Sequence, residues 1–97
     1  MSDINFSWST QKAKINKRKH GVSFEEAKTV FYDQNALFIN DPDHSNHEER
    51  FIILGLSYIL RILVVCHCYR KDDKNIRLIS ARKASKKEQN QYWGKIK

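Results

Sequence analysis

The chain has 97 residues, of which 40% are hydrophobic and 30% are charged, and this composition excludes a disordered or fibrous chain. It fits a single small domain over residues 1–97. The 18 basic and 11 acidic residues give a net charge of +7, so the favoured partners are polyanions such as nucleic acid, an acidic protein or anionic lipid.

No targeting or membrane-spanning segment is recognisable in the sequence. The first residues lack the basic and apolar regions of a signal peptide. The longest apolar stretch, residues 51–65, contains Ser57 and Arg61 and is too short to span a bilayer. Cys66 and Cys68 lie too close together on one predicted strand to pair without distortion, so we expect buried, reduced thiols. These features predict a cytoplasmic protein with no membrane partner.

Two helices are predicted in the N-terminal third of the chain. Ser9 or Thr10 can cap the first, which carries mostly lysine on its surface and stops at Gly21. Ser23 and Glu26 form a capping box that opens the second, and an apolar stripe extends from there to about residue 32. The second helix is therefore suited to covering one face of a sheet.

Four strands are predicted at residues 36–39, 50–57, 62–69 and 75–81, and short connections between them favour an antiparallel meander. A second capping box, from Ser85 to Glu88, opens a C-terminal helix. The predicted fold class is α+β, with two N-terminal helices, a four-stranded antiparallel sheet and a C-terminal helix. One face of the sheet is expected to remain partly open.

Two groups of residues suggest metal ligands, and neither fits a metal site well. Strand alternation turns His67 away from Cys66 and Cys68, which disfavours a zinc site. The acid- and histidine-rich loop at residues 41–49 has no recognised ligand spacing and is better explained as a solvated loop. We expect no metal and no cofactor.

A third group of residues, spread over neighbouring strands, suggests phosphate chemistry. If the last hairpin pairs Tyr69 with Asn75, then His67 lies opposite Arg77 on one face, whereas a one-residue slip moves Arg77 to the other face. Cations, an imidazole and a carboxylate would then surround one strip of sheet. Such a set can supply a base, an acid and charge stabilisation for RNA cleavage, or it can be a cationic face that only binds phosphates.

Several motifs, spread in order over nearly the whole chain, occur together in one known family. They are Phe6-x-Trp8, Asn16-x-x-Lys19-His20-Gly21-Val22-Ser23-Phe24-Glu25-Glu26-Ala27, Asp41-Pro42-Asp43-His44-Ser45, Glu48-Glu49-Arg50-Phe51-Ile52-x-x-Gly55-x-Ser57, Val64-Val65-x-His67 and Arg77-x-Ile79-Ser80-Ala81-Arg82-Lys83-Ala84, followed by Glu88. In these motifs the chain resembles the BrnT family of type II toxin–antitoxin ribonucleases.

The resemblance implies a RelE-like fold and metal-independent RNA cleavage that arrests translation. It also implies an antitoxin partner of the BrnA type, a ribbon–helix–helix protein encoded beside the toxin. The complex would repress its own operon, so operator DNA would be contacted only through that complex.

We therefore predict a toxin endoribonuclease whose RNA site lies on the sheet. The predicted catalytic residues are Arg77, His67, Glu49 and Arg50, and the predicted substrate-binding residues are Arg82, Lys83, Arg61 and Tyr92. The alternatives are a non-catalytic nucleic-acid-binding module or operon co-repressor of the same fold, and an adaptor that binds only an acidic partner. RNA cleavage separates the first reading from the other two.

Overall fold

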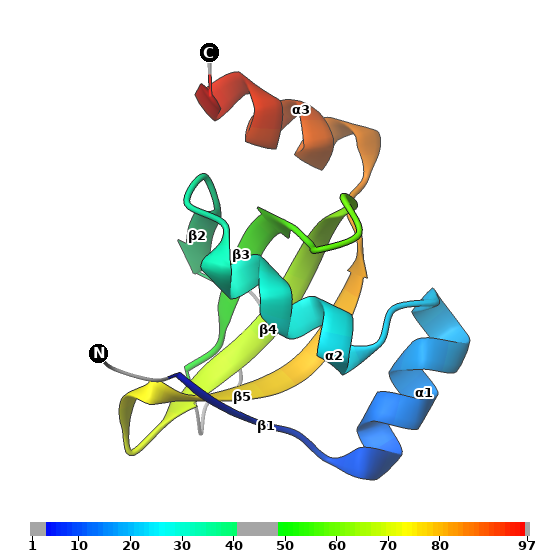
Figure 1. Ribbon diagram of the computed structural model, residues 1–97, viewed down its shortest axis with the longest axis vertical. Coiled ribbons are helices and arrows are strands. Elements are labelled where there is room, and N and C mark those ends of the chain that lie inside the picture. Colours follow the sequence, from blue (N-terminus) through cyan, green and yellow to red (C-terminus); the bar gives the residue numbers. More distant parts are fainter. Residues whose placement is uncertain (1–3, 41–48, 97) are drawn as a thin grey trace.

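The structure is a computed structural model that describes residues 4–40 and 49–96. Along the chain the elements are β1 (Asn5–Ser7), α1 (Thr10–His20), α2 (Phe24–Ala27), the 3₁₀ helix η1 (Lys28–Tyr32), β2 (Leu37–Asn40), β3 (Phe51–Leu56), β4 (Ile62–Arg70), β5 (Asp72–Lys83) and α3 (Lys86–Ile96). One twisted sheet forms the centre, with the helices arranged around it (Figure 1).

The sheet has the strand order β1-β5-β4-β3-β2, and its mixed topology corrects the prediction of four antiparallel strands. Strands β2 to β5 are antiparallel neighbours as expected, but β1 adds a fifth strand parallel to β5. Phe6 pairs with Ile76, and its side chain packs against the apolar cluster to which Ile76 belongs. Strand β1 has only three residues, which are too few to show strand alternation, so it could not be predicted from the hydrophobic pattern.

The N-terminal helices differ in part from the prediction. Helix α1 begins after Ser9, whose hydroxyl accepts a hydrogen bond from the backbone of Lys12, and ends at Gly21 in the left-handed conformation (φ 71°). The second predicted helix is only one turn of α-helix followed by η1. Where α-helix gives way to 3₁₀ helix, the hydroxyl of Thr29 donates to the carbonyl of Glu26 (2.6 Å), a local contact that competes with regular helix geometry.

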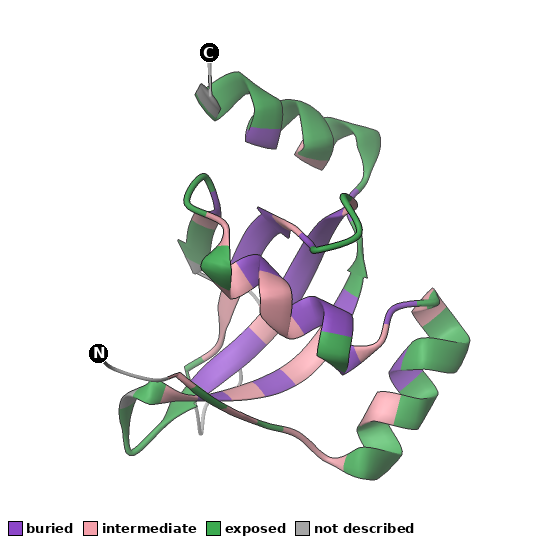
Figure 2. Cartoon of the chain, viewed as in Figure 1, coloured by how far each residue is buried: buried purple, intermediate pink, exposed green. Residues whose placement is uncertain are grey.

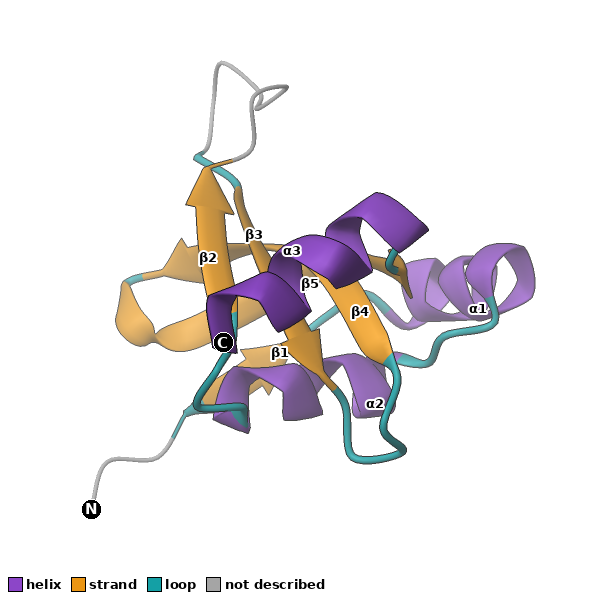
Figure 3. Cartoon of the chain, turned by 90° about the horizontal axis from the view of Figure 1, so that it is seen from above, coloured by secondary structure: helices purple, strands orange, loops and turns teal. Residues whose placement is uncertain are grey.

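The two faces of the sheet bury separate apolar clusters. The inner face, defined here as the face covered by α2 and η1, carries a cluster that includes Phe24, Val30 and Leu78. On the opposite face α3 covers one end, where Tyr92 packs with Leu54 (Figures 2 and 3). The rest of this second face is called the open face below. Among the described helices, none is long and apolar enough to cross a membrane.

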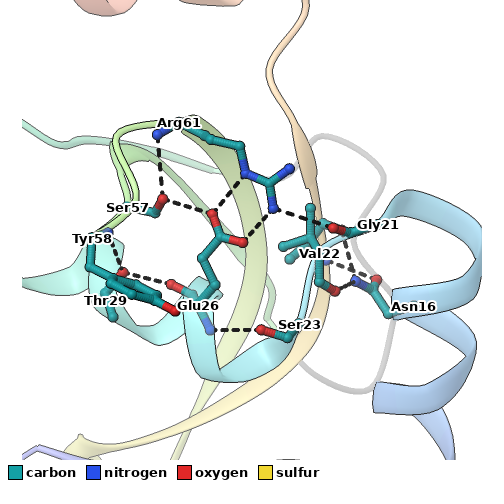
Figure 4. Close-up of polar contacts among 10 residues, drawn as sticks. Asn16, Gly21, Val22, Ser23, Glu26, Thr29, Ser57, Tyr58 and Arg61 are labelled. Atoms are coloured by element: carbon teal, nitrogen blue, oxygen red, sulfur yellow. Dashed lines mark hydrogen bonds and ion pairs between the residues drawn. The ribbon is translucent and has the colours of Figure 1, made fainter.

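Asn16 fixes α1 against the outer edge of β5. Its side chain is 6% exposed, and its amide donates to the carbonyls of Val22 and Ala81, both at 2.9 Å. Its oxygen accepts from the Ala81 backbone N–H at 3.0 Å, so one side chain pairs with β5 as a neighbouring strand would. Figure 4 shows Asn16 reaching across to Val22. Helix α1 thereby becomes a fixed part of the sheet edge.

We expect Asn16→Ala to lower the free energy of unfolding by about 2–4 kcal/mol, because it leaves three buried backbone groups without partners. Urea unfolding followed by circular dichroism measures this. Lys14→Ala, on the exposed side of the same helix, is the matched control and should change stability by less than about 0.5 kcal/mol. Equal behaviour of the two variants would show that Asn16 does not anchor α1.

Candidate active site

The register of β4 and β5 determines which of the predicted site residues meet. His67 pairs with Leu78 and Cys68 pairs with Arg77, so His67 and Arg77 project from opposite faces of the sheet. The expected pairing of His67 with Arg77 is wrong by one residue. The cause is the hairpin: β5 already begins at Asp72, and irregularities between Tyr69 and Arg70 and between Cys66 and His67 shift the register.

His67 lies in the core of the inner face. The side chain is 0% exposed and contacts four aromatic rings, of which Phe31 is nearest at 4.8 Å between ring centroids. Its Nδ1 lies 3.2 Å from the carbonyl oxygen of Val65, and its Nε2 has no hydrogen-bond partner. Burial lowers the pKa of the imidazole to about 4. A neutral, enclosed imidazole is in no position to exchange protons with a substrate.

Arg61 is tied to a buried carboxylate. Its guanidinium donates to both oxygens of Glu26 and to the carbonyl of Gly21, and the Ser57 hydroxyl donates to Glu26 at 2.7 Å (Figure 4). Burial alone would raise the pKa of Glu26, but the hydrogen bonds and positive charge of Arg61, with Ser57, hold it below its ordinary value. Arg61 thus joins the β3–β4 turn to α2, and its charge is neutralised there.

Arg82 is also paired. Its guanidinium makes two hydrogen bonds to Glu88, at 2.8 and 2.9 Å, and Glu88 also completes the capping box of α3 with Ser85. The hydrogen bonds from Arg82 hold the pKa of Glu88 at about 2. Because the pair lies at the surface, a phosphate could still compete for Arg82. Lys83, next in the chain, is exposed.

Tyr92 is not exposed to a substrate. The ring is 1% exposed, and its hydroxyl donates to Asp33 at 2.6 Å. Burial and this carboxylate raise the pKa of Tyr92 to about 12. Its neighbour Trp93 is 47% exposed and is the aromatic of α3 that could stack on a base. Adjacent residues lie about 100° apart around a helix, so one of the two can face the sheet while the other is exposed. Which one is buried was decided by the packing of α3 on the sheet.

Arg50 and Arg77 are the two predicted arginines without a carboxylate partner among the described residues. Arg77 is half-buried beside Cys68. By strand alternation Arg50, one residue before β3, lies on the other side of Cys68 on the same open face. The Nε of Arg50 is buried and has no hydrogen-bond partner. Two arginines that flank one buried thiol, one of them with an unpaired buried donor, form a site suited to an anion.

Glu49 adds a carboxylate at the rim of this site. It is exposed, and with Phe51, Cys68 and Tyr69 it lines a hollow of about 360 Å³. Cys68 belongs both to this hollow and to the strip between the arginines. By strand alternation Glu49 lies on the side of Phe51 and Tyr69, so it is next to Arg50 in the chain but not on the face that carries the two arginines.

Metal ligands are not assembled in the part of the chain that the structure describes. In residues 4–40 and 49–96, no three His, Cys, Asp or Glu side chains are grouped to hold an ion. Neither Cys66 nor Cys68 forms a disulfide, and they are half-buried and buried respectively. The acid-rich loop at residues 41–48 lies outside the described residues.

Comparison with known proteins decides the family. The family model described as "Ribonuclease toxin, BrnT, of type II toxin-antitoxin system" matches residues 8–88. The chain belongs to the BrnT ribonuclease toxin family. The resemblance seen in the sequence motifs is thereby confirmed.

A solved structure supports the fold of this BrnT family member. The crystal structure of the Brucella abortus ribonuclease toxin BrnT matches with a TM-score of 0.62 and 22% sequence identity, over 86% of this chain and 99% of that one. At this identity the match bears on the fold alone, and it agrees with an α+β architecture. The comparison with curated proteins finds no match.

Most residues of the first long BrnT motif have structural roles in this chain. Asn16 anchors α1, Gly21 ends it, Ser23 caps α2 and Glu26 holds Arg61. A motif can therefore be specific for a family without containing the catalytic groups. The anchoring role of Asn16 was not predicted, because a single asparagine inside a lysine-rich helix carries no signal of burial.

We expect Arg61→Ala to lower the free energy of unfolding by about 2–4 kcal/mol, because it leaves the Glu26 carboxylate buried with only Ser57 as partner. Urea unfolding measures this, and Arg77→Ala, which removes an arginine without a carboxylate partner, is the control. The depressed pKa of Glu26 contributes stability above its ordinary value of 4.5, and this is lost as pH falls through the lower folded pKa. The Arg61→Ala variant should lack this contribution. An Arg61→Ala protein as stable as wild type would leave Arg61 available for substrate.

We expect His67→Leu to retain RNA cleavage, because the imidazole is enclosed and neutral. The same variant should make stability less dependent on pH. In the unfolded chain His67 binds a proton below its ordinary pKa of 6.5, whereas in the folded chain it binds one only below about pH 4. The free energy of unfolding of the wild type therefore falls as pH is lowered across that interval. Unfolding free energies at about pH 7 and pH 5 test this, and equal slopes for both proteins would contradict it.

Proposed function

We propose that this BrnT family member is a metal-independent endoribonuclease whose catalytic centre is the Arg50–Arg77 pair on the open face, with Glu49 at its rim. The observation that carries the proposal is the contrast among the arginines. Arg61 and Arg82 are neutralised by Glu26 and Glu88, whereas Arg50 and Arg77 meet no carboxylate among the described residues and the buried Nε of Arg50 has no hydrogen-bond partner. Because the family is described as a ribonuclease toxin, we propose that the bound anion is an RNA phosphate.

In the proposed reaction the ribose 2′-hydroxyl attacks the neighbouring phosphate and displaces the 5′-oxygen. The two guanidinium groups bind the non-bridging oxygens, where negative charge grows during attack. Glu49, exposed and next to Arg50 in the chain, is the candidate base for the 2′-hydroxyl proton. The departing 5′-oxygen takes a proton from water. The products would be a 2′,3′-cyclic phosphate end and a 5′-hydroxyl end.

The original assignment of His67 as acid or base is not retained in this proposal. Arg61 and Tyr92 are likewise treated as structural, because both are held by carboxylates inside the fold. Arg82 and Lys83 stay as substrate-binding candidates at the end of β5. They would position the RNA backbone rather than stabilise the transition state.

The partner that we propose is an antitoxin of the BrnA type, and the setting is the cytoplasm, where RNA cleavage would inhibit translation. Membership of a type II toxin–antitoxin family supports a protein antitoxin and an RNA substrate. The net charge of +7 also favours an acidic neutralising segment. We expect contact with operator DNA only within the toxin–antitoxin complex.

The test is cleavage of labelled single-stranded RNA by the purified full chain with EDTA present. We expect cleavage to continue, with cyclic-phosphate ends identified by their resistance to poly(A) tailing until they are removed. Arg77→Ala and Arg50→Ala should each reduce the rate by about a hundredfold or more, because each removes a donor to the developing charge. Lys83→Ala should act mainly on binding.

Each alternative gives a different result. Binding without cleavage, at verified solubility and folding, would favour the non-catalytic module. Activity lost on chelation, or 3′-hydroxyl products, would indicate a metal mechanism. Full activity in both arginine variants would place the catalytic centre elsewhere.

A further inference from the structure

A second cationic feature lies outside the proposed catalytic centre, between α1 and the outer edge of β5. A groove of about 190 Å³ opens there. Helix α1 contributes Lys12, Lys19 and His20 to its wall, and β5 contributes Ile79 and Ser80. The groove therefore combines a cationic side with a partly apolar strand side.

The floor of the groove is formed by Ile15 and by Asn16. Ile15 is 50% exposed, although it is one of few apolar residues on α1, and it faces the same hollow as Ile79 on β5. Asn16 is held in place by its three backbone hydrogen bonds, so this floor is fixed. Exposed aliphatic side chains between lysines of a fixed helix offer a surface for a flat ring with a phosphate attached.

Helix α1 carries no acidic residue of its own, and of its cations Lys17 interacts with the Glu26 carboxylate of α2. The helix spans Thr10–His20 and includes Lys12, Lys14, Lys17, Arg18 and Lys19 without a single acidic residue. Lys12 and Lys19 are seven residues apart, about two turns, so they lie on the groove side. Lys14 and Arg18 are exposed on the opposite side and do not line the groove. The helix thus provides both a groove pair and a matched outer pair of cations.

The groove is close to the Arg50–Arg77 centre along β5. Strand β1 covers the outer edge of β5 only from Asn75 to Arg77, and Asn16 reaches it again at Ala81. Ile79 and Ser80, the β5 residues that line the groove, lie between these two contacts. Ser80 is three residues from Arg77, about 10 Å along the strand. A single RNA strand bound at Arg77 can therefore continue over the edge of β5 into the groove.

We propose that this groove binds an unpaired nucleotide of the RNA substrate, next to the cleaved phosphate. The base packs on Ile15 and Ile79, and Lys12 and Lys19 hold the adjoining phosphate. The substrate is a single strand, since bases in a duplex are paired and stacked and cannot reach the aliphatic floor. This inference rests on the proposed function for the identity of the ligand as RNA.

The experiment compares two double variants that lose the same charge from the same helix. The groove variant is Lys12→Ala with Lys19→Ala, and the control is Lys14→Ala with Arg18→Ala. The ligand is a labelled single-stranded RNA with 2′-O-methyl groups, which cannot be cleaved, and fluorescence anisotropy gives Kd at several salt concentrations. We expect the groove variant to raise Kd about tenfold and to reduce the salt slope by about one to one and a half, and the control to change neither substantially.

A third variant tests the apolar floor. Ile15→Gln should weaken binding of the same RNA several-fold without changing its salt slope, because it alters contact with the base and not with phosphate. The side chain is half exposed, so the substitution should leave the fold intact, and thermal unfolding of all three variants checks this.

Three results would overturn the proposal. Equal losses in the two double variants would mean that α1 acts only as a diffuse positive surface. A groove variant that binds RNA normally but escapes neutralisation by the antitoxin would assign the groove to the protein partner. An Ile15→Gln protein with wild-type affinity would remove the base contact.

These outcomes are independent of the cleavage test. If wild type binds uncleavable RNA through the groove but never cleaves RNA, the proposed catalytic function fails and the groove site stands. If wild type cleaves RNA and both double variants bind alike, the groove site fails and the catalytic function stands.

Discussion

The pairing of β4 with β5 is the constraint on which the site depends. With His67 opposite Leu78 and Cys68 opposite Arg77, the imidazole lies under η1 and the guanidinium lies on the open face. A shift of one residue would exchange the two, because neighbouring residues of a strand point to opposite faces. It would also expose Ile76 and Leu78, which are now buried. The apolar core therefore holds the register, and the register places the arginine.

The four arginines predicted for the site divide into two groups, according to whether they meet a carboxylate among the described residues. Arg61 and Arg82 each meet a carboxylate and connect elements of the fold, one to α2 and the other to the start of α3. Such pairs satisfy the donors of the guanidinium and remove its net charge from the surface. Arg50 and Arg77 have no such partner among the described residues, and the buried Nε of Arg50 is left unsatisfied. An unsatisfied buried donor is costly, so it commonly marks a place that a ligand completes.

Helix α1 shows how a fold can present charge in a fixed position. Its own apolar surface is small, and a lysine-rich helix of 11 residues would be marginal in isolation. Asn16 compensates by hydrogen bonding to the backbone N–H and C=O of Ala81. Gly21 ends α1 and Ser23 caps α2, so the chain passes directly from one helix to the next. The backbone that carries the lysines on either side of Asn16 is consequently held against the strand. Cations on an anchored helix can recognise a substrate, whereas cations on a mobile tail mainly attract one.

The sequence by itself determined the elements whose causes are local. The caps at Ser9 and Gly21 and the box from Ser85 to Glu88 were predicted correctly, because a cap depends on residues within one turn. The motifs also identified the family. The tertiary structure alone decided the faces: β4 is apolar at both alternations, so its pattern could not tell which side of His67 was buried. It also decided which arginines are paired, because Glu26 and Arg61 are 35 residues apart and meet only after the sheet has formed.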